Sequence, residues 1–152
     1  MGQADSCPMG GNIMMQAVIM AGGKGTRLAA LTKDEIPKPM VPVAGKPLLL
    51  WQVERLKENG ITDIIMVIGH LGDKIKEYFG DGEKFGVAIR YYEETEPLGT
   101  AGSFYYLKDM IHGERFVMMS GDLFFDIDFQ RMIRFHEEKG AVATLFVHPN
   151  GH

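Results

Sequence analysis

The sequence is short of cysteine, of long apolar runs and of excess positive charge. Its 152 residues include one cysteine, Cys7, which cannot form an internal disulfide. This excludes a disulfide-stapled secreted scaffold and favours a reducing compartment, the cytoplasm. No segment approaches the roughly 18 to 20 consecutive apolar residues of a membrane-spanning helix. With 16 basic and 20 acidic residues, the net charge of −4 gives no general attraction to nucleic acid or to an anionic membrane.

The composition is otherwise that of a globular domain. The chain is 45% hydrophobic and 24% charged, and its length suits one domain with a sizeable core. The first twelve residues, MGQADSCPMGGN, are small and polar and lack the basic and apolar regions of a signal peptide. We expect a disordered leader that ends at residue 14, ahead of one ordered unit, residues 15–152.

Short apolar runs typical of buried strands alternate with helical segments. The expected strands are AVIMA at 17–21, DIIMVIG at 63–69, VAIRYY at 87–92, RFVMMS at 115–120 and AVATLFV at 141–147. Helical periodicity marks the segments 45–60, 100–110 and 128–140. Pro47 and Asp128 suit helix starts, and Gly60 and Gly140 suit left-handed ends. This alternation predicts βαβ crossovers and an α/β fold with a mostly parallel sheet.

A glycine-rich, basic loop, AGGKGTRL at 21–28, follows the first expected strand. Ligands of a parallel sheet bind beyond the carboxyl ends of its strands, where glycine backbones can approach an anion and Lys24 and Arg27 add positive charge. The spacing does not fit a Walker A loop, and Leu28 stands where the dinucleotide fingerprint needs a glycine. The loop indicates phosphate binding of another kind, with an ordinary glycine-rich turn as the alternative.

Prolines surround Lys38 in the next segment, EIPKPMVPVAGKPLL at 35–49. Pro37 fixes its own backbone, and Pro39 favours an extended conformation of Lys38. A lysine presented from a stiff segment that faces the glycine loop can clamp a phosphate. The alternative is that the prolines only route a loop.

These motifs together resemble the sugar-1-phosphate nucleotidyltransferase family, the pyrophosphorylases that make nucleotide sugars. AGGKGTRL is followed by IPKPMVPVAGKPLL, EPLGTAGS and SGD, in the order found in that family. The resemblance implies a Rossmann-like three-layer fold, Mg²⁺ as cofactor, and transfer of a nucleotidyl group from a nucleoside triphosphate to a sugar 1-phosphate with release of pyrophosphate. The resemblance is also compatible with a homo-oligomer. The chain would be the N-terminal, nucleotide-binding part of the family domain, truncated at its C-terminal side.

The resemblance assigns the phosphate chemistry to the glycine loop and to Lys38. Thr26 would add a hydrogen bond to the triphosphate, and Arg27 would hold the departing pyrophosphate. Lys38 would neutralise charge at the transferring phosphoryl group, because in-line attack brings two anions together and needs no protein nucleophile. The remaining residues of the loop would bind substrate through their backbone; they are Ala21, Gly22, Gly23 and Gly25.

The metal ligand implied by the resemblance is Asp122, in the motif SGD after the fourth expected strand. A carboxylate oxygen suits Mg²⁺, which usually takes one or two protein carboxylates beside phosphate oxygens and water. The alternative is an aspartate that caps a turn. Asp126 and Asp128 form a D-x-D that could indicate a glycosyltransferase metal site, but a helix cap at Asp128 and a loop position for Asp126 are favoured.

Base recognition is expected from YYEETEPLGTAGS. The resemblance places Gly99 and Thr100 against the base, with Pro97 and Leu98 shaping its slot. Glu94 falls where thymidylyl relatives carry a glutamine. Because a carboxylate only accepts hydrogen bonds and guanine offers two adjacent donors, Glu94 favours GTP.

Two other functional classes remain open. One is a glycosyltransferase that uses a nucleotide-diphosphate sugar, and the other is a non-catalytic nucleotide-binding piece. The preferred hypothesis is guanylyl transfer, with manno-heptose 1-phosphate slightly ahead of mannose 1-phosphate as acceptor.

Overall fold

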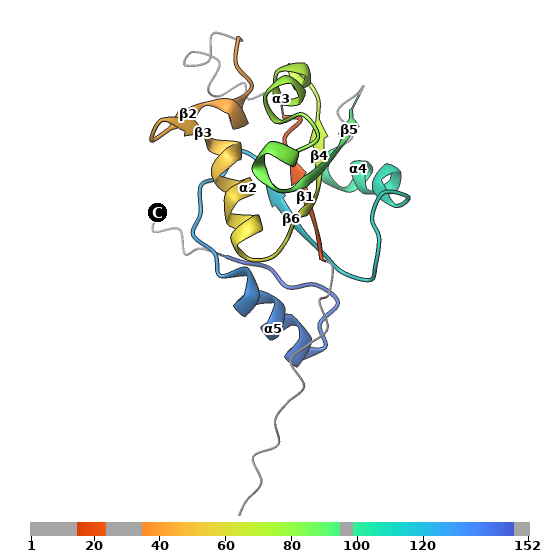
Figure 1. The fold of residues 1–152 in the computed structure, drawn as a ribbon. Helices are drawn as coiled ribbons and strands as arrows, with labels where there is room; N and C mark the ends of the chain where they lie inside the picture. Colours follow the sequence, from red (N-terminus) through yellow and green to blue (C-terminus); the bar gives the residue numbers. More distant parts are fainter. Residues whose placement is uncertain (1–14, 24–34, 95–98, 148–152) are drawn as a thin grey trace, which may run out of the picture.

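A computed structural model of the protein describes residues 15–23, 35–94 and 99–147. Its centre is a four-stranded sheet in the order β5-β4-β1-β6, in which every neighbouring pair is parallel (Figure 1). The strands are β1 (Gln16–Met20), β4 (Asp63–Ile68), β5 (Ala88–Glu93) and β6 (Phe116–Ser120). A separate antiparallel hairpin consists of β2 (Pro42–Val43) and β3 (Lys46–Pro47).

Helices cover both faces of the sheet and give the fold three layers. The α-helices are α2 (Leu48–Glu58), α3 (Gly72–Phe79), α4 (Gly99–Leu107) and α5 (Phe129–Lys139), and the 3₁₀ helices are η2 (Lys38–Met40) and η3 (Glu83–Phe85). The larger core lies between the sheet and the helices α2, α3 and α5, and the smaller core lies beneath α4. None of the described helices is both long and apolar enough to cross a membrane.

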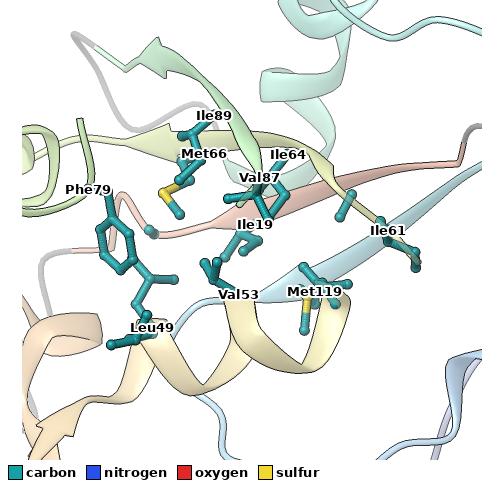
Figure 2. Close-up of a cluster of buried hydrophobic side chains, with 14 of the residues drawn as sticks. Ile19, Leu49, Val53, Ile61, Ile64, Met66, Phe79, Val87, Ile89 and Met119 are labelled. Atoms are coloured by element: carbon teal, nitrogen blue, oxygen red, sulfur yellow. The ribbon is translucent and has the colours of Figure 1, made fainter. Parts of the chain in front are cut away.

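The period of two along each strand divides the core between the two faces. In β1, Ile19 belongs to the larger core and Val18 to the smaller. Figure 2 shows Leu49 and Val53 of α2 beneath Ile19, with Met66 of β4 on the same side. Burial on both faces explains why these strands are continuous apolar runs rather than alternating ones.

The strand order places a topological switch point between β1 and β6. From β1 the chain proceeds through α2 to β4 and through α3 to β5, and then returns through α4 to β6 on the other side of β1. Ligands of open α/β sheets bind outside the carboxyl ends of the strands at such a point. The arrangement confirms the predicted α/β fold with a mostly parallel sheet. It locates Asp122 and the described start of the expected phosphate loop, residues 21–23, at the switch point.

Local capping signals are also confirmed. The Asp128 side chain accepts a hydrogen bond from the backbone N–H of Arg131 at 2.9 Å, so it is the N-cap of α5. Gly140 ends this helix with a φ of +55°, and Gly60 follows α2 with a φ of +79°. Helix α3 and the β2–β3 hairpin were not predicted.

The expected strand at 141–147 is wrong. Within the described part of the chain, the one backbone hydrogen bond recorded for this segment joins the Ala141 N–H to the His136 carbonyl. Val142 and Leu145 are 103% and 83% exposed. A β-branched run forms a strand only where a neighbouring strand pairs with it and covers one face. Among residues 15–23, 35–94 and 99–147, no strand pairs with this segment.

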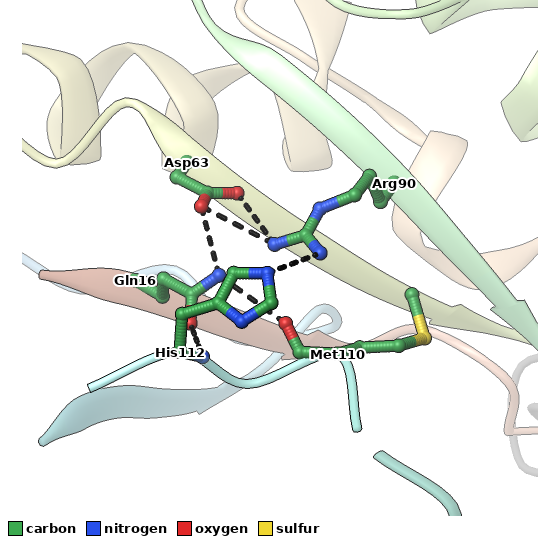
Figure 3. A network of polar contacts seen from close by, with 5 residues as sticks. All are labelled: Gln16, Asp63, Arg90, Met110 and His112. Atoms are coloured by element: carbon green, nitrogen blue, oxygen red, sulfur yellow. Dashed lines mark hydrogen bonds and ion pairs between the residues drawn. The ribbon is translucent and has the colours of Figure 1, made fainter. Parts of the chain in front are cut away.

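A polar network lies at the amino ends of the strands, at the end of the sheet opposite to the switch point (Figure 3). Gln16, at the start of β1, donates to Asp63 of β4 at 2.8 Å and accepts from the backbone N–H of His112. Arg90 of β5 contacts both carboxylate oxygens of Asp63, at 3.0 and 3.2 Å. These contacts join three strands at their amino ends, remote from the switch point.

Candidate functional site

Backbone hydrogen bonds hold the segments that follow β1, β5 and β6 beyond the carboxyl ends of these strands. The N–H of Ala21 donates to Val67 at 2.7 Å, and the N–H of Glu94 donates to Ile68 at 2.8 Å. On the other side of β1, the N–H of Gly121 donates to Met20 at 2.8 Å. The described start of the glycine loop is therefore flanked by Glu94 on one side and by the Asp122 turn on the other.

Lys38 and Asp122 are brought into direct contact. The Lys38 Nζ donates to Asp122 Oδ2, and the Ser120 hydroxyl donates to Asp122 Oδ1 at 2.6 Å. Both side chains of the ion pair are partly exposed, 27% for the lysine and 32% for the aspartate. A ligand at the switch point can thus reach a fixed ammonium and a fixed carboxylate.

The electrostatic surroundings keep Asp122 ionised. Burial raises the pKa of its carboxyl, but hydrogen bonds from Lys38 and Ser120 and the positive charge of Lys38 outweigh burial and hold this pKa below its usual value. At neutral pH the side chain is a carboxylate, which is the form that binds a divalent cation.

The expectation that Lys38 is extended is wrong. Lys38 begins the 3₁₀ helix η2, in which the N–H of Met40 donates to Pro37 at 2.8 Å and the N–H of Val41 donates to Lys38 at 3.2 Å. Pro39 fits here because the first turn of a helix does not need its missing N–H. It is Pro37 that is extended, with a ψ of 141°. The lysine is still held by a stiff segment, but by a helical turn.

Gly22 lies where a side chain would crowd its neighbours. A Cβ atom at this position would be 3.0 Å from Glu94 Oε2 and 3.3 Å from the backbone nitrogen of Gly69. Gly69 is more restricted, because its own Cβ would be 2.8 Å from the Gly22 carbonyl oxygen, a backbone atom. The ends of β1 and β4 are therefore packed backbone to backbone, with the Glu94 carboxylate beside them.

A residue of helix α4 orients the Glu94 side chain. The buried hydroxyl of Ser103, in α4, donates to Glu94 Oε1. The second oxygen, Oε2, faces Gly22. Glu94 is half-buried, so a base in this place would meet an acceptor whose direction is fixed.

The described residues fit a magnesium site of low protein coordination. Asp122 supplies one ionised, hydrogen-bonded carboxylate, and Mg²⁺ commonly takes one or two such ligands together with substrate phosphates. No cluster of three or more His, Cys, Asp or Glu side chains arranged for a metal occurs in the described ranges. The D-x-D alternative loses its support, because Asp126 pairs with Arg55 and is largely exposed while Asp128 caps α5.

Several expected site residues lie outside the described ranges or are described only in part. Gly99 and Thr100 form the first positions of α4, which gives their backbone conformation. The expected residues outside the described ranges are Gly25, Thr26, Arg27, Pro97 and Leu98.

Three residues near the site were not predicted. Gln52 of α2 contacts the backbone on both sides of Asp122, and its signal in the sequence is a polar residue on the apolar face of a helix. Gly69 is the last residue of a predicted strand, and a glycine at the end of a strand is a weaker signal. For Ser103, no feature of the sequence points to its contact with Glu94.

Known proteins with similar sequences are nucleotidyltransferases. The chain is 43% identical over 129 residues to D-glycero-alpha-D-manno-heptose 1-phosphate guanylyltransferase of Campylobacter jejuni, covering 85% of this chain and 57% of that one. It is 37% identical over 142 residues to UTP–glucose-1-phosphate uridylyltransferase of Synechocystis, covering 86% of this chain and 36% of that one. The chain thus spans between about a third and just over half of these relatives.

A solved structure gives the same result. The crystal structure of HddC from Yersinia pseudotuberculosis complexed with GMP-PN matches with a TM-score of 0.72 and 33% sequence identity, over 81% of this chain and 54% of that one. The family model described as nucleotidyl transferase matches residues 16–152. Motifs, fold and comparisons agree, and the chain belongs to the nucleotidyl transferase family.

Proposed function

We propose that the chain is the nucleotide-binding part of an enzyme that transfers a guanylyl group from GTP to a sugar 1-phosphate, giving a GDP-sugar and pyrophosphate. The observation that carries the proposal is the contact between Lys38 and Asp122 beside the first residues of the glycine loop, at the switch point of a parallel sheet. A fixed cation and a fixed carboxylate at this position suit phosphoryl chemistry that depends on positioning and charge.

Each group has a definite task in such a reaction. The backbone of Ala21, Gly22 and Gly23 approaches the triphosphate, and Lys38 donates to oxygens of the phosphoryl group under attack. Asp122 would hold Mg²⁺, which would supply positive charge to neutralise the phosphates. Arg27 and Thr26, which belong to the same loop, complete the phosphate contacts. No protein nucleophile is required, because the sugar phosphate oxygen attacks directly.

The choice of GTP rests on Glu94. The N1–H and N2–H of guanine are adjacent donors, and both carboxylate oxygens of Glu94 are acceptors. Uracil and thymine suit a carboxylate less, because they present only one donor, which lies between two acceptors. The half-buried position of Glu94 beside Gly22 supports a base at this point, with Pro97, Leu98, Gly99 and Thr100 around it.

The acceptor and the setting belong to the same proposal. The similarity to a manno-heptose 1-phosphate guanylyltransferase supports manno-heptose 1-phosphate ahead of mannose 1-phosphate. The single cysteine supports a cytoplasmic location. Residues 15–152 would form the nucleotide-binding unit, with residues 1–14 as a leader.

A thermal melt with Mg²⁺ and GTP, dTTP, UTP, CTP or ATP tests the proposal. A ligand that binds only the folded state stabilises it by about 2.7 kcal/mol at a hundredfold excess over its Kd. We expect GTP to raise the melting temperature most, and we expect Asp122→Asn to remove most of the part that depends on Mg²⁺. An equal effect of all five nucleotides would overturn the guanylyl assignment, and no effect of any would overturn nucleotide binding by this chain.

A further inference from the structure

Gln52 is a buried polar residue on the core-facing side of α2. It is 3% exposed, and the neighbouring positions on that side, Leu49, Val53 and Leu56, are fully buried apolar residues. Burying an amide among apolar side chains costs free energy unless its polar atoms are paired. The position of Gln52 therefore calls for a specific hydrogen-bonding role.

The amide nitrogen of Gln52 binds both sides of the Asp122 turn. Nε2 donates to the Ser120 carbonyl at 3.0 Å and to the Leu123 carbonyl at 2.6 Å. These carbonyls lie two residues before and one residue after Asp122, so both donors of the amide are used on the turn that presents the carboxylate.

The amide oxygen of Gln52 has no comparable role. Within the described part of the chain, Oε1 is buried and without a hydrogen-bond partner. An unpaired buried acceptor is unfavourable, because it has lost its hydrogen bonds to water. The donors of Gln52, rather than its acceptor, thus account for an amide at this position.

The same turn is fixed from the opposite side by β1. The N–H of Gly121 donates to Met20, and a Cβ atom on Gly121 would be 3.1 Å from the Met20 carbonyl oxygen and 3.2 Å from the Ala21 side chain. The backbone around Asp122 is therefore held between β1 and α2, with Gln52 as the link to the helix.

We infer that Gln52 is a positioning residue for Asp122, which sets the backbone of the turn so that the carboxylate faces a divalent cation. The inference rests on the metal-binding role of Asp122 in the proposed function. Gln52 itself does not contact the cation. Its loss allows the turn to relax, so the carboxylate binds the cation more weakly.

The protein contains a natural probe of this turn. Trp51, the single tryptophan of the chain, packs edge-to-face on Phe124 with ring centroids 6.1 Å apart. The two residues also line a cavity of about 310 Å³ between α2 and the segment 123–126. Displacement of the turn should change the environment of Trp51, and with it the fluorescence.

The experiment compares Gln52→Met with Gln16→Met. Gln16 is also a buried glutamine whose amide donates to a backbone carbonyl, but it lies at the other end of β1. Binding of Mn²⁺, a hard cation that can replace Mg²⁺ at oxygen ligands, is measured from the free Mn²⁺ signal in electron paramagnetic resonance and from Trp51 emission. We expect Gln52→Met to raise the Kd for Mn²⁺ about tenfold, and Gln16→Met to leave the Kd unchanged even where it lowers the melting temperature.

Two further variants separate the outcomes. Gln52→Glu keeps the size of the side chain but, when ionised, has no donor, so it should weaken Mn²⁺ binding at least as much; it also serves if Gln52→Met does not fold. If Asp122→Asn abolishes Mn²⁺ binding while both Gln52 variants bind as the wild type does, the inference is overturned and the metal site stands. If Asp122→Asn binds Mn²⁺ normally, the metal site and the inference both fall.

Discussion

Lys38 and Asp122 are 84 positions apart in the chain, yet the ammonium of the lysine contacts the carboxylate of the aspartate at the switch point of the sheet. The lysine is the counter-ion of the carboxylate. A cation that binds Asp122 must share it with Lys38 or displace it. Cation binding would then free the ammonium for a phosphate.

This competition predicts opposite effects of Lys38→Met on the metal and on the nucleotide. Partly exposed ion pairs contribute up to about 1 kcal/mol, so removal of the lysine should tighten Mn²⁺ binding without nucleotide by up to about fivefold. The same variant should weaken stabilisation by GTP. Titrations of Mn²⁺ and of GTP into the wild type and the variant test both; weaker Mn²⁺ binding in Lys38→Met would contradict the competition.

The pKa of Asp122 predicts how its contribution to stability depends on pH. A carboxyl whose pKa is lower in the folded state stabilises the fold above its unfolded value, about 3.9, and this contribution is lost as the pH falls through the folded value. The difference in free energy of unfolding between the wild type and Asp122→Asn should be constant above about pH 5 and shrink below about pH 4. Denaturant unfolding over this range measures it. A difference independent of pH would mean that Lys38 and Ser120 do not stabilise the carboxylate.

We expect substitutions at Gly22 and Gly23 to affect different properties, the stability of the fold at Gly22 and the binding of nucleotide at Gly23. Gly22→Ala places a methyl group 3.0 Å from Glu94 Oε2 and should destabilise the fold by roughly 1–3 kcal/mol. For Gly23, no described atom lies within 4 Å of such a methyl group, so Gly23→Ala should melt like the wild type. If the triphosphate lies along this backbone, Gly23→Ala should nevertheless lose stabilisation by GTP. Full GTP binding by Gly23→Ala would exclude a close approach of the phosphates.

Glu94 and Ser103 predict the selectivity for the base. In Glu94→Gln one acceptor becomes a donor and meets a donor of guanine, so the preference for GTP over UTP should fall about tenfold or more, as expected for lost hydrogen bonds to a charged group. ITP, which lacks the N2 amino group, should bind the wild type more weakly than GTP. Ser103→Ala removes the hydroxyl that orients the carboxylate and should reduce the same preference by a smaller factor. Calorimetric titration of each nucleotide gives the ratio of the Kd for UTP to the Kd for GTP. An unchanged ratio in Glu94→Gln would show that Glu94 does not recognise the base.

The sequence correctly predicted the features that depend on only a few neighbouring residues, such as helix caps and helix ends. The cap at Asp128 and the left-handed glycines Gly60 and Gly140 follow from backbone and side-chain preferences within a few residues. The strand predicted at 141–147 failed because strand formation needs a partner that a local pattern does not reveal.

In the candidate site, too, features set by nearby residues were predicted and contacts between distant residues were not. Its motifs could be placed after the correct strands, since parallel strands end at a common edge. The contact between Gln52 and the Asp122 turn could not be predicted, because it joins residues 68 and 71 positions apart through a helix–sheet packing that the sequence does not specify. The 3₁₀ turn at Lys38 was missed because two prolines satisfy either an extended segment or the start of a helix.

The strand order β5-β4-β1-β6 separates two parts of the candidate site. Glu94 follows β5 and Asp122 follows β6, the two outermost strands, and Gly22 at the end of β1 lies between them. In the proposed function, side chains after β5 read the nucleobase, and the pair formed by Lys38 and Asp122 acts on the phosphates. Changes after β5 should therefore retarget such a scaffold to another nucleotide without disturbing that pair.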